Sequence, residues 1–280
     1  MMNRPVRSAL YIPGSKARAL DKARSLPCDA ILFDLEDAVA PDAKADARET
    51  LRDALAEGGY GMRLRLVRIN GLDTPWGAED ARAAAGMDCD GVLVPKVNGP
   101  ADLDAVADLV PDRPLWAMME TPRGILNAAA IATHPRLAGF VIGTNDLAKD
   151  LGTRTRPALG MALQHCLLAA RAAGILCIDG VYNAYQDEDG LRAECEDGRA
   201  LGFDGKSLIH PAQIDAANAV FGPSGEDIDL ARRQISAHDA AVARGQGVAV
   251  VDGRIVENLH VVTARATLAQ ADAIAALERT

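Results

Sequence analysis

The sequence predicts an α/β fold, a (β/α)8 barrel of the TIM type with a C-terminal extension. Eight short apolar runs alternate with longer helix-periodic segments, and this alternation gives right-handed βαβ units and a parallel sheet. Eight units favour closure into a barrel, for which 280 residues are sufficient. The glycine fingerprints of nucleotide-binding open sheets, G-x-G-x-x-G and G-x-x-x-x-G-K-S/T, do not occur in the sequence.

The expected strands are short segments rich in Val, Ile and Leu: 8–12, 30–35, 64–69, 91–95, 115–119, 139–142, 175–178 and 205–209. Helix periodicity is clear at 16–26, 41–57 and 158–173. In the second of these helices, Pro41 suits a first-turn position, and Leu51 and Leu55 recur at helical spacing. Gly58 and Gly59 then end it.

A C-terminal extension follows the eighth strand. Residues 211–221, 228–244 and 260–277 are expected to be helices, residues 247–251 a strand, and Asp252-Gly253 a turn. No linker rich in Pro, Gly or Ser separates the extension from the barrel. We therefore predict a catalytic barrel over residues 1–222 and a helical extension over residues 223–280 that serves as a lid or an oligomerisation contact.

Composition limits the classes of partner. A net charge of −9 argues against nucleic acid or an anionic membrane as the main partner. The five cysteines are scattered and form no C-x-x-C pair, as is typical of a reduced cytosolic protein without a zinc site. The N-terminus has no apolar signal-peptide core and no apolar run is long enough to span a membrane, so we expect a cytoplasmic protein.

The expected strands deliver many polar residues to one end of the barrel, the end where parallel barrels place their active sites. Unpaired buried charges are costly, so this accumulation indicates function rather than stability. The residues concerned are Asp34, Glu36, Asp37, Arg68, Asn70, Lys96, Glu120, Asn145, Asp146, Asp179 and His210.

Glu120 and Asp146 stand at the ends of two successive strands. Two carboxylates with further acids nearby suit a hard cation such as Mg²⁺ that keeps several waters, and no histidine pair has zinc-ligand spacing. In the alternative interpretation, Glu120 pairs with Arg68 or Arg123, and Asp146 caps the following helix. Spacing alone does not separate the two interpretations.

Basic residues at the same end are candidates for anion binding. Arg68 can hold a carboxylate or a developing oxyanion in bidentate fashion, or else form a structural ion pair with Glu36 or Asp37. Lys16 and Lys22 follow a Pro-Gly turn. They belong either to a phosphate-binding patch at a helix N-terminus or to a solvated helix face.

These motifs together resemble the citrate lyase β-subunit-like family of CoA-ester lyases, within the HpcH/HpaI aldolase superfamily. The resemblance runs nearly from end to end, which makes it specific. It is carried by residues 7–14 (RSALYIPG), 34–39 (DLEDAV), 67–70 (VRIN), 95–97 (PKV), 119–122 (METP), 143–148 (GTNDLA), 202–206 (GFDGK) and 209–214 (IHPAQI).

The resemblance implies a barrel that works as a homotrimer or hexamer on a CoA thioester. It implies Mg²⁺, with Mn²⁺ as a substitute, on Glu120 and Asp146, and contact between Arg68 and the acyl group. Asp37 in the DLEDAV motif is added as a catalytic candidate. Substrate or CoA contacts are implied for Tyr11, Lys16, Lys22, Arg68, Asn145, Asp146, Ile209 and His210. Without the resemblance, His210 is simply a strand-end residue that orients a loop.

Residues 253–260 (GRIVENLH) match the segment in which malyl-CoA lyases carry an acid that closes over the neighbouring subunit's site. The acid in this sequence is Glu257 rather than aspartate, and the usual following proline is absent. The longer side chain moves the carboxylate by about one carbon–carbon bond, and misplacements of ~1 Å can cost about 10²-fold in rate. The chemistry is therefore expected to differ from that of the malyl-CoA lyases.

This segment, with residues 115–120 (LWAMME) and 180–184 (GVYNA), is most similar to the malyl-CoA thioesterase branch. The expected reaction is Mg-dependent hydrolysis of (3S)-malyl-CoA to malate and CoA, with Glu257 positioning or deprotonating the water. One alternative is a lyase that cleaves malyl-, β-methylmalyl- or citramalyl-CoA by a retro-Claisen route. Another is a non-catalytic, carrier-dependent subunit, against which the acid and arginine set argues.

Overall fold

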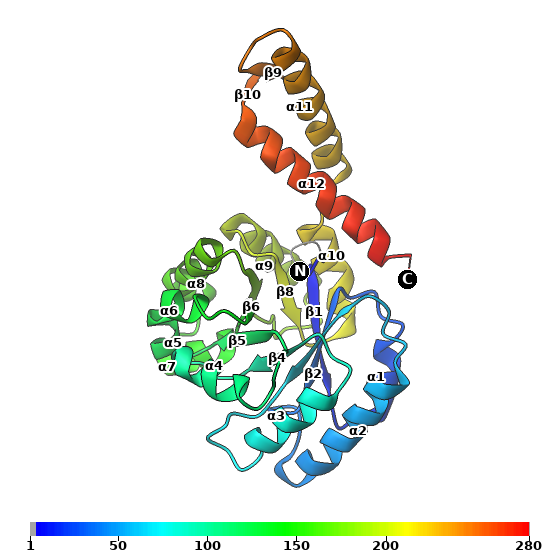
Figure 1. The fold of residues 1–280 in the computed structure, drawn as a ribbon, viewed down its shortest axis with the longest axis vertical. Helices are drawn as coiled ribbons and strands as arrows, with labels where there is room; N and C mark the ends of the chain where they lie inside the picture. The colour runs from blue at the N-terminus through cyan, green and yellow to red at the C-terminus, as the bar shows by residue number, and fades with distance from the viewer. Residues whose placement is uncertain (1–3, 280) are drawn as a thin grey trace.

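The computed structural model describes residues 4–279. A closed barrel of eight parallel strands in sequence order, with β8 paired back to β1, confirms the predicted fold (Figure 1). No strand end differs from its predicted position by more than two residues. The strands are β1 (Ser8–Pro13), β2 (Ala30–Asp34), β3 (Leu64–Arg68), β4 (Gly91–Val94), β5 (Leu115–Met119), β6 (Leu137–Ile142), β7 (Leu176–Asp179) and β8 (Gly205–Leu208).

The barrel strands bury both of their faces. Side chains such as Leu32, Leu66 and Trp116 form the inner core, whereas Phe33 and Val67 belong to the larger core shared with the surrounding helices. Because both faces are apolar, these strands appear in the sequence as nearly continuous hydrophobic runs. The polar residues at the C-terminal ends of the strands therefore mark the rim of the barrel.

Helices cover the outside of the barrel. The helix expected at 41–57 begins as a 3₁₀ turn, η1 (Pro41–Ala43), and continues as α2 (Lys44–Glu57). The one expected at 16–26 is shorter, α1 (Ala17–Ala23), and Pro27 disfavours helical backbone just before it. The others are α3 (Gly77–Gly86), α4 (Pro100–Ala107), α5 (Pro122–Leu126), α6 (Ala128–Ala132), α7 (Thr144–Leu151), η2 (Arg156–Leu159), α8 (Gly160–Ala173), α9 (Glu188–Leu201), η3 (Pro211–Gln213) and α10 (Ile214–Phe221).

The extension consists of two long helices joined by a small β-hairpin: α11 (Gly225–Ala243), β9 (Ala249–Val251), β10 (Arg254–Val256) and α12 (Asn258–Leu277). Asp252 and Gly253 form the hairpin turn with φ of 50° and 74°, the left-handed pair that a two-residue type I′ turn requires. The sequence predicted one strand in the extension, and β10 was not predicted. None of the described helices is both long and apolar enough to cross a membrane.

The extension stands at the end of the barrel where the strands begin. In Figure 1, α11 and α12 project beyond the start of β1, away from the C-terminal rim. A cavity of about 710 Å³ at their base is lined by Val6, Leu176 and Phe203 of the barrel and by Ala264 and Gln270 of α12. A second cavity, of about 1270 Å³, also lies at this end, and neither contains the predicted metal pair.

Candidate active site

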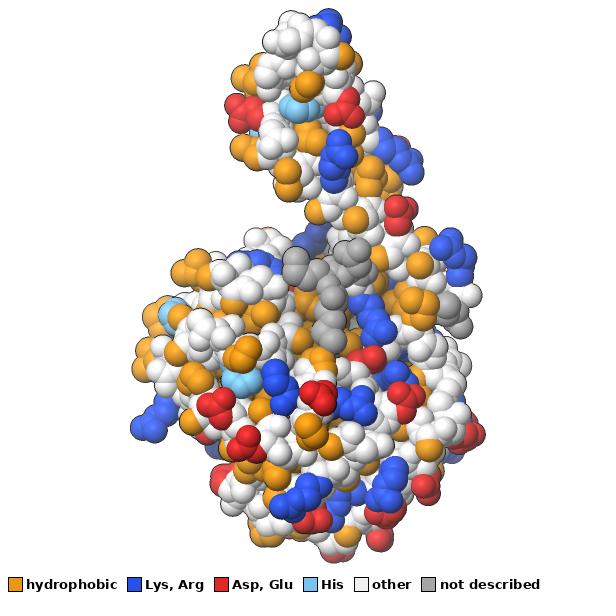
Figure 2. Space-filling view, in the orientation of Figure 1, with side chains coloured by type: hydrophobic (Ala, Val, Ile, Leu, Met, Phe, Trp, Pro, Cys, Tyr) orange, Lys and Arg blue, Asp and Glu red, His pale blue; other side chains and the backbone are white. Residues whose placement is uncertain are grey.

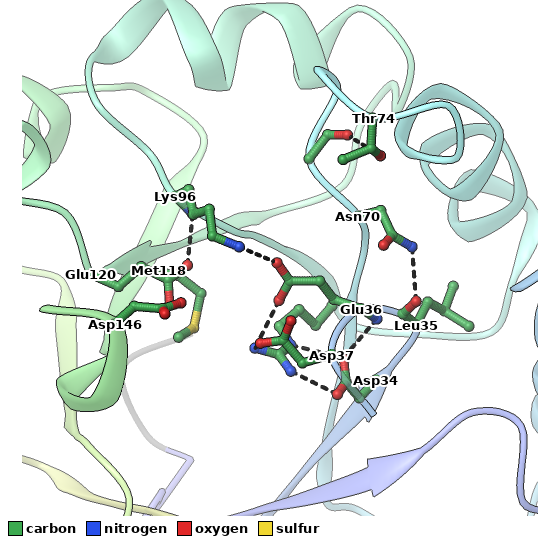
Figure 3. Close-up of polar contacts among 12 residues, drawn as sticks. Asp34, Leu35, Glu36, Asp37, Asn70, Thr74, Lys96, Met118, Glu120 and Asp146 are labelled. Carbon is green, nitrogen blue, oxygen red and sulfur yellow. Dashed lines mark hydrogen bonds and ion pairs between the residues drawn. The ribbon is translucent and has the colours of Figure 1, made fainter. Parts of the chain in front are cut away.

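Four charged side chains are buried together at the C-terminal rim of the barrel. Asp34 ends β2 and Arg68 ends β3, whereas Glu36 and Glu120 lie just beyond β2 and β5. None of the four is more than 8% exposed. Figure 3 shows Asp34 and Glu36 in one connected network with Lys96 and, through its backbone contact, Glu120. The folding of distant strands into one barrel thus brings these predicted site residues together.

The guanidinium of Arg68 is held by two acids. Its Nε and Nη2 donate to the two carboxylate oxygens of Asp34 at 2.8 and 2.6 Å, and its Nη1 lies 2.9 Å from Oε2 of Glu36. The Tyr11 ring centroid lies 4.8 Å from the guanidinium carbon. The sequence predicted the Glu36 pair as an alternative and placed Asp34 at the rim, but it did not predict the pairing of Asp34 with Arg68. Asp34 and Arg68 are register partners on β2 and β3, and their matching strand-end positions were the available signal.

Glu120 is a buried carboxylate with one oxygen engaged. It is 3% exposed, and its Oε1 accepts a hydrogen bond from the Lys96 backbone N–H at 2.8 Å. The other oxygen lies over Gly143, where an added Cβ would come within 2.3 Å of it, so this close approach requires glycine. Burial and, next, the negative charge of Glu36 raise the pKa of the Glu120 carboxyl to about 7.

Asp146 lies in the first turn of α7, three residues after Gly143. Its side chain is 32% exposed and lies 3.8 Å from Nζ of Lys149. The expected alternative roles of the two acids are wrong: the N-cap residue of α7 is Gly143 without a side-chain cap, and within residues 4–279 no ion pair joins Glu120 to Arg68 or Arg123. Figure 3 shows the carboxyl groups of Glu120 and Asp146 next to each other.

This pair of carboxylates fits a hard divalent cation. Within residues 4–279, no three His, Cys, Asp or Glu side chains are grouped so that they could hold a metal ion, so the chain offers two ligands rather than a closed cage. Mg²⁺ is bound in this way in many proteins, through one or two carboxylates, while water or substrate supplies the other ligands. A cation would also offset the cost of the buried Glu120 charge.

Lys96 adopts an unusual backbone conformation beside these acids. Its φ is 50°, in the left-handed region, which costs a non-glycine residue on the order of 1–2 kcal/mol. Its Nζ donates to Oε1 of Glu36 at 2.9 Å. The sequence placed Lys96 at the rim without a specific role, because neither its backbone angle nor its partners on other strands can be recognised from local pattern.

The residues expected to contact CoA fall into two groups. Lys16 and Lys22 are exposed at α1, and neither has an ion-pair partner in the part of the chain that the structure describes. Tyr11 is half-buried in the barrel mouth, where its hydroxyl donates to Sδ of Met118 at 3.4 Å and its ring contacts Arg68. Tyr11 thus lies beside the acidic network rather than on the exposed face of α1.

The loops after β6, β7 and β8 also meet at the rim. Asn145 Oδ1 accepts from Asn183 Nδ2 at 2.7 Å, which joins α7 to the loop after β7. The His210 ring stacks on Tyr185 with centroids 4.6 Å apart, and its Nδ1 accepts from the Ala212 N–H at 3.2 Å, which caps η3. The expected loop-orienting role of His210 is therefore visible. Asn183 was recognised only within the GVYNA motif, without a role, and Tyr185 was not singled out, because their loop carries no strand-end signal.

The two remaining catalytic candidates are exposed. The Asp37 side chain is 69% exposed, and its Oδ2 lies 3.9 Å from Nη1 of Arg68. Glu257 is the N-cap residue of α12, and its N–H donates to Nδ1 of His260 at 3.0 Å. Because the extension projects from the opposite end of the barrel, the structure does not bring Glu257 near Glu120 of the same chain (Figure 1).

Comparison with known proteins finds relatives that match nearly the whole chain. A (3S)-malyl-CoA thioesterase from Cereibacter sphaeroides is 64% identical over 275 residues, which are 97% of this chain and 96% of that protein. An L-malyl-CoA/beta-methylmalyl-CoA lyase from the same species is 35% identical over 307 residues, covering 98% of this chain and 96% of that protein.

Solved structures agree with the sequence relatives. The crystal structure of CitE from Mycobacterium tuberculosis in complex with magnesium, acetoacetate and coenzyme A superposes with a TM-score of 0.82. It shares 30% identity and covers 97% of this chain and 100% of that one. The sequence signature of the HpcH/HpaI aldolase/citrate lyase family matches residues 7–211, which contain all eight strands. This chain therefore belongs to the HpcH/HpaI aldolase/citrate lyase family.

Proposed function

We propose that this protein hydrolyses the thioester of (3S)-malyl-CoA to malate and CoA, in a reaction that depends on Mg²⁺ held by Glu120 and Asp146. The structural observation that carries the proposal is the buried Glu120 carboxylate, whose second oxygen, Oε2, lies against Gly143 at the start of the helix that bears Asp146. Further support comes from the relative named a (3S)-malyl-CoA thioesterase, which is 64% identical over nearly the whole chain.

The proposed cation has a limited chemical task. Mg²⁺ supplies a Lewis acid that orients oxygen groups of the substrate and offsets developing negative charge. Glu120 and Asp146 would hold it, and a solved relative with this fold was crystallised with magnesium and coenzyme A. Mn²⁺ also accepts oxygen ligands and is proposed as a substitute.

Arg68 is proposed to hold the acyl group. A guanidinium has five N–H donors. Asp34 contacts Nε and Nη2, and Glu36 contacts Nη1, so each nitrogen has one acid contact. The remaining donors can bind the substrate carboxylate or the developing oxyanion, together with backbone amides near Asn145. Asp37, exposed beside Arg68, is proposed to assist proton transfer with solvent.

The exposed lysines suit the phosphates of CoA. Lys16 at the start of α1 and Lys22 in its last turn are both exposed, and they would attract the nucleotide end of CoA. Ile209 is 41% exposed and would lie along the CoA arm with His210. Tyr11 would bind deeper, close to Arg68.

We further propose that the protein acts as a homotrimer or hexamer in which Glu257 serves a neighbouring subunit. The extension of one chain points away from that chain's own rim, which supports a role for its acid in another copy (Figure 1). There Glu257 would position or deprotonate the attacking water. Water attack on the thioester carbonyl transfers the acyl group to water, and the thiol of CoA leaves with a proton.

Retro-Claisen cleavage is the second candidate reaction. It would use the same acid pair and Arg68 to stabilise the enolate of acetyl-CoA or propionyl-CoA, with glyoxylate or pyruvate as the other product. The relative named an L-malyl-CoA/beta-methylmalyl-CoA lyase supports it at 35% identity. The higher identity of 64% to the relative named a (3S)-malyl-CoA thioesterase favours hydrolysis over this reaction.

Product analysis separates the two reactions. Purified protein is incubated with (3S)-malyl-CoA, with and without Mg²⁺, and malate, CoA, glyoxylate and acetyl-CoA are quantified. We expect malate and CoA in equal amounts, and only with the cation. Glyoxylate and acetyl-CoA without malate would refute the hydrolase proposal and leave the lyase.

A further inference from the structure

Lys96, the second residue after β4, contacts one buried acid through its backbone and another through its side chain. Its backbone N–H donates to Oε1 of Glu120 at 2.8 Å, and its Nζ donates to Oε1 of Glu36 at 2.9 Å. Its side chain is 50% exposed, so it reaches inward from the solvent side of the rim. One residue thus fixes one oxygen of each acid (Figure 3).

The second oxygen of each acid then has a defined direction. Oε2 of Glu36 lies 2.9 Å from Nη1 of Arg68, so Glu36 is held between two cations. Oε2 of Glu120 lies over Gly143, the residue that precedes α7 and Asp146. Lys96 therefore engages Oε1 of Glu120 and leaves Oε2 on the side of Gly143 and Asp146, and its Nζ holds Glu36 beside Arg68.

Lysine is an unusual residue for the left-handed backbone at position 96. A φ of 50° favours glycine or asparagine, and lysine adopts it only when the surroundings determine the conformation. A glycine would present the same backbone N–H to Glu120 without strain, but it has no side chain to hold Glu36. The contact between Nζ and Glu36 accounts for a long cationic side chain on a backbone that suits glycine.

We propose that Lys96 is a positioning residue of this site. Its left-handed backbone turns the free oxygen of Glu120 toward Asp146, and its side chain holds Glu36 against Arg68. The inference rests on the proposed function in one respect, that Glu120 and Asp146 bind the cation. It is independent of whether hydrolysis or carbon–carbon cleavage follows.

The backbone role is tested by two variants that both lose Nζ. Glycine adopts a φ of 50° freely, whereas the β-branched side chain of valine resists it. Mg²⁺ is titrated calorimetrically into metal-free Lys96→Gly and Lys96→Val proteins without substrate, and circular dichroism checks that both are folded. We expect Lys96→Val to bind Mg²⁺ at least about tenfold more weakly than Lys96→Gly. Equal affinities would overturn the backbone role. If Lys96→Val does not fold, Lys96→Ala is compared with Lys96→Asn in the same way.

The side-chain role is tested by Lys96→Met and Lys96→Arg, which differ in charge. We expect kcat to fall about tenfold in Lys96→Met with a smaller change in KM, and Lys96→Arg to recover most of it. Equal losses in the two variants would overturn this role. If the parent protein binds no Mg²⁺, both the proposed metal pair and the Lys96 role are overturned. If the parent binds Mg²⁺ but Lys96→Gly and Lys96→Val bind it equally well, only the Lys96 backbone role is overturned.

Discussion

Glu120 has the environment that is hardest to explain by stability. It is 3% exposed, its pKa is raised to about 7 by burial and by Glu36, and within residues 4–279 its one direct donor is the Lys96 N–H. Such perturbed acids cluster at functional sites. The position of Glu120 after an apolar run could be predicted from the sequence. Its electrostatic surroundings could not, because Glu36 and Lys96 come from other strands.

The raised pKa of Glu120 predicts a pH-dependent stability. Because the folded-state pKa of about 7 exceeds the ordinary 4.5, folding favours the protonated form, and stability in metal-free buffer decreases as the pH rises from about 4.5 to about 7. The decrease amounts to about 3 kcal/mol for this group. Glu120→Gln should remove most of this pH dependence, as measured by urea unfolding in chelator-treated buffer at about pH 5 and about pH 8.

A matched control is Glu49→Gln, which neutralises an exposed acid on α2. This variant should keep the pH dependence of the parent protein. An unfolding free energy of Glu120→Gln that falls with pH as steeply as that of the parent would contradict the buried-acid account.

Among the structural elements, the β9–β10 hairpin shows what local sequence can and cannot predict. Asp252-Gly253 is a strong hairpin signal, and the turn was predicted. The strand that follows it was not, because its three residues, Arg254–Val256, are too few to show alternation. The eight barrel strands were predicted within two residues, because burial of both faces makes each a continuous apolar run.

Gly253→Ala should weaken the hairpin that carries the chain into Glu257. An added Cβ meets no atom within 4 Å at Gly253, so the cost comes from the φ of 74° alone and is about 1 kcal/mol. We expect a several-fold lower kcat/KM with an unchanged barrel, measured by steady-state kinetics and near-ultraviolet circular dichroism. Gly247→Ala lies in the same extension, also has open space for a Cβ and has no positive φ, so it should behave as the parent. Equal losses in both variants would contradict the turn-specific account.

For the whole molecule, the arrangement of barrel and extension bears on the proposed assembly. Glu257 begins α12 in the extension and Glu120 follows β5, and the extension projects from the end of the barrel where the strands begin (Figure 1), so the proposed site would take its two acids from two copies. Figure 2 shows the extension as a separate projection with apolar side chains on its surface, and Val250, Ile255, Leu259 and Val262 are each at least 60% exposed. Large exposed apolar side chains gathered in this way are typical of protein contacts.

Mixing two inactive variants tests this arrangement. Glu120→Gln and Glu257→Gln subunits are unfolded together, refolded at a ratio of 1:1 and assayed. In a closed ring in which each site takes one acid from each of two neighbours, about one quarter of the sites regain both acids. We expect activity in the mixed assembly near that fraction of the parent's. A mixture as inactive as its two components would contradict the shared site, provided that size-exclusion chromatography shows the assembly to be reformed.

The most direct test of the central proposal is hydrolysis of (3S)-malyl-CoA in ¹⁸O-labelled water with Mg²⁺, followed by mass spectrometry of the products. Water attack at the thioester carbonyl predicts free CoA and malate with one ¹⁸O atom in the carboxylate released from sulfur. Glu120→Gln should form neither product at an appreciable rate, because it removes one of the two acids that would hold the cation. Acetyl-CoA and glyoxylate from the parent protein, or malate without the label, would contradict the account.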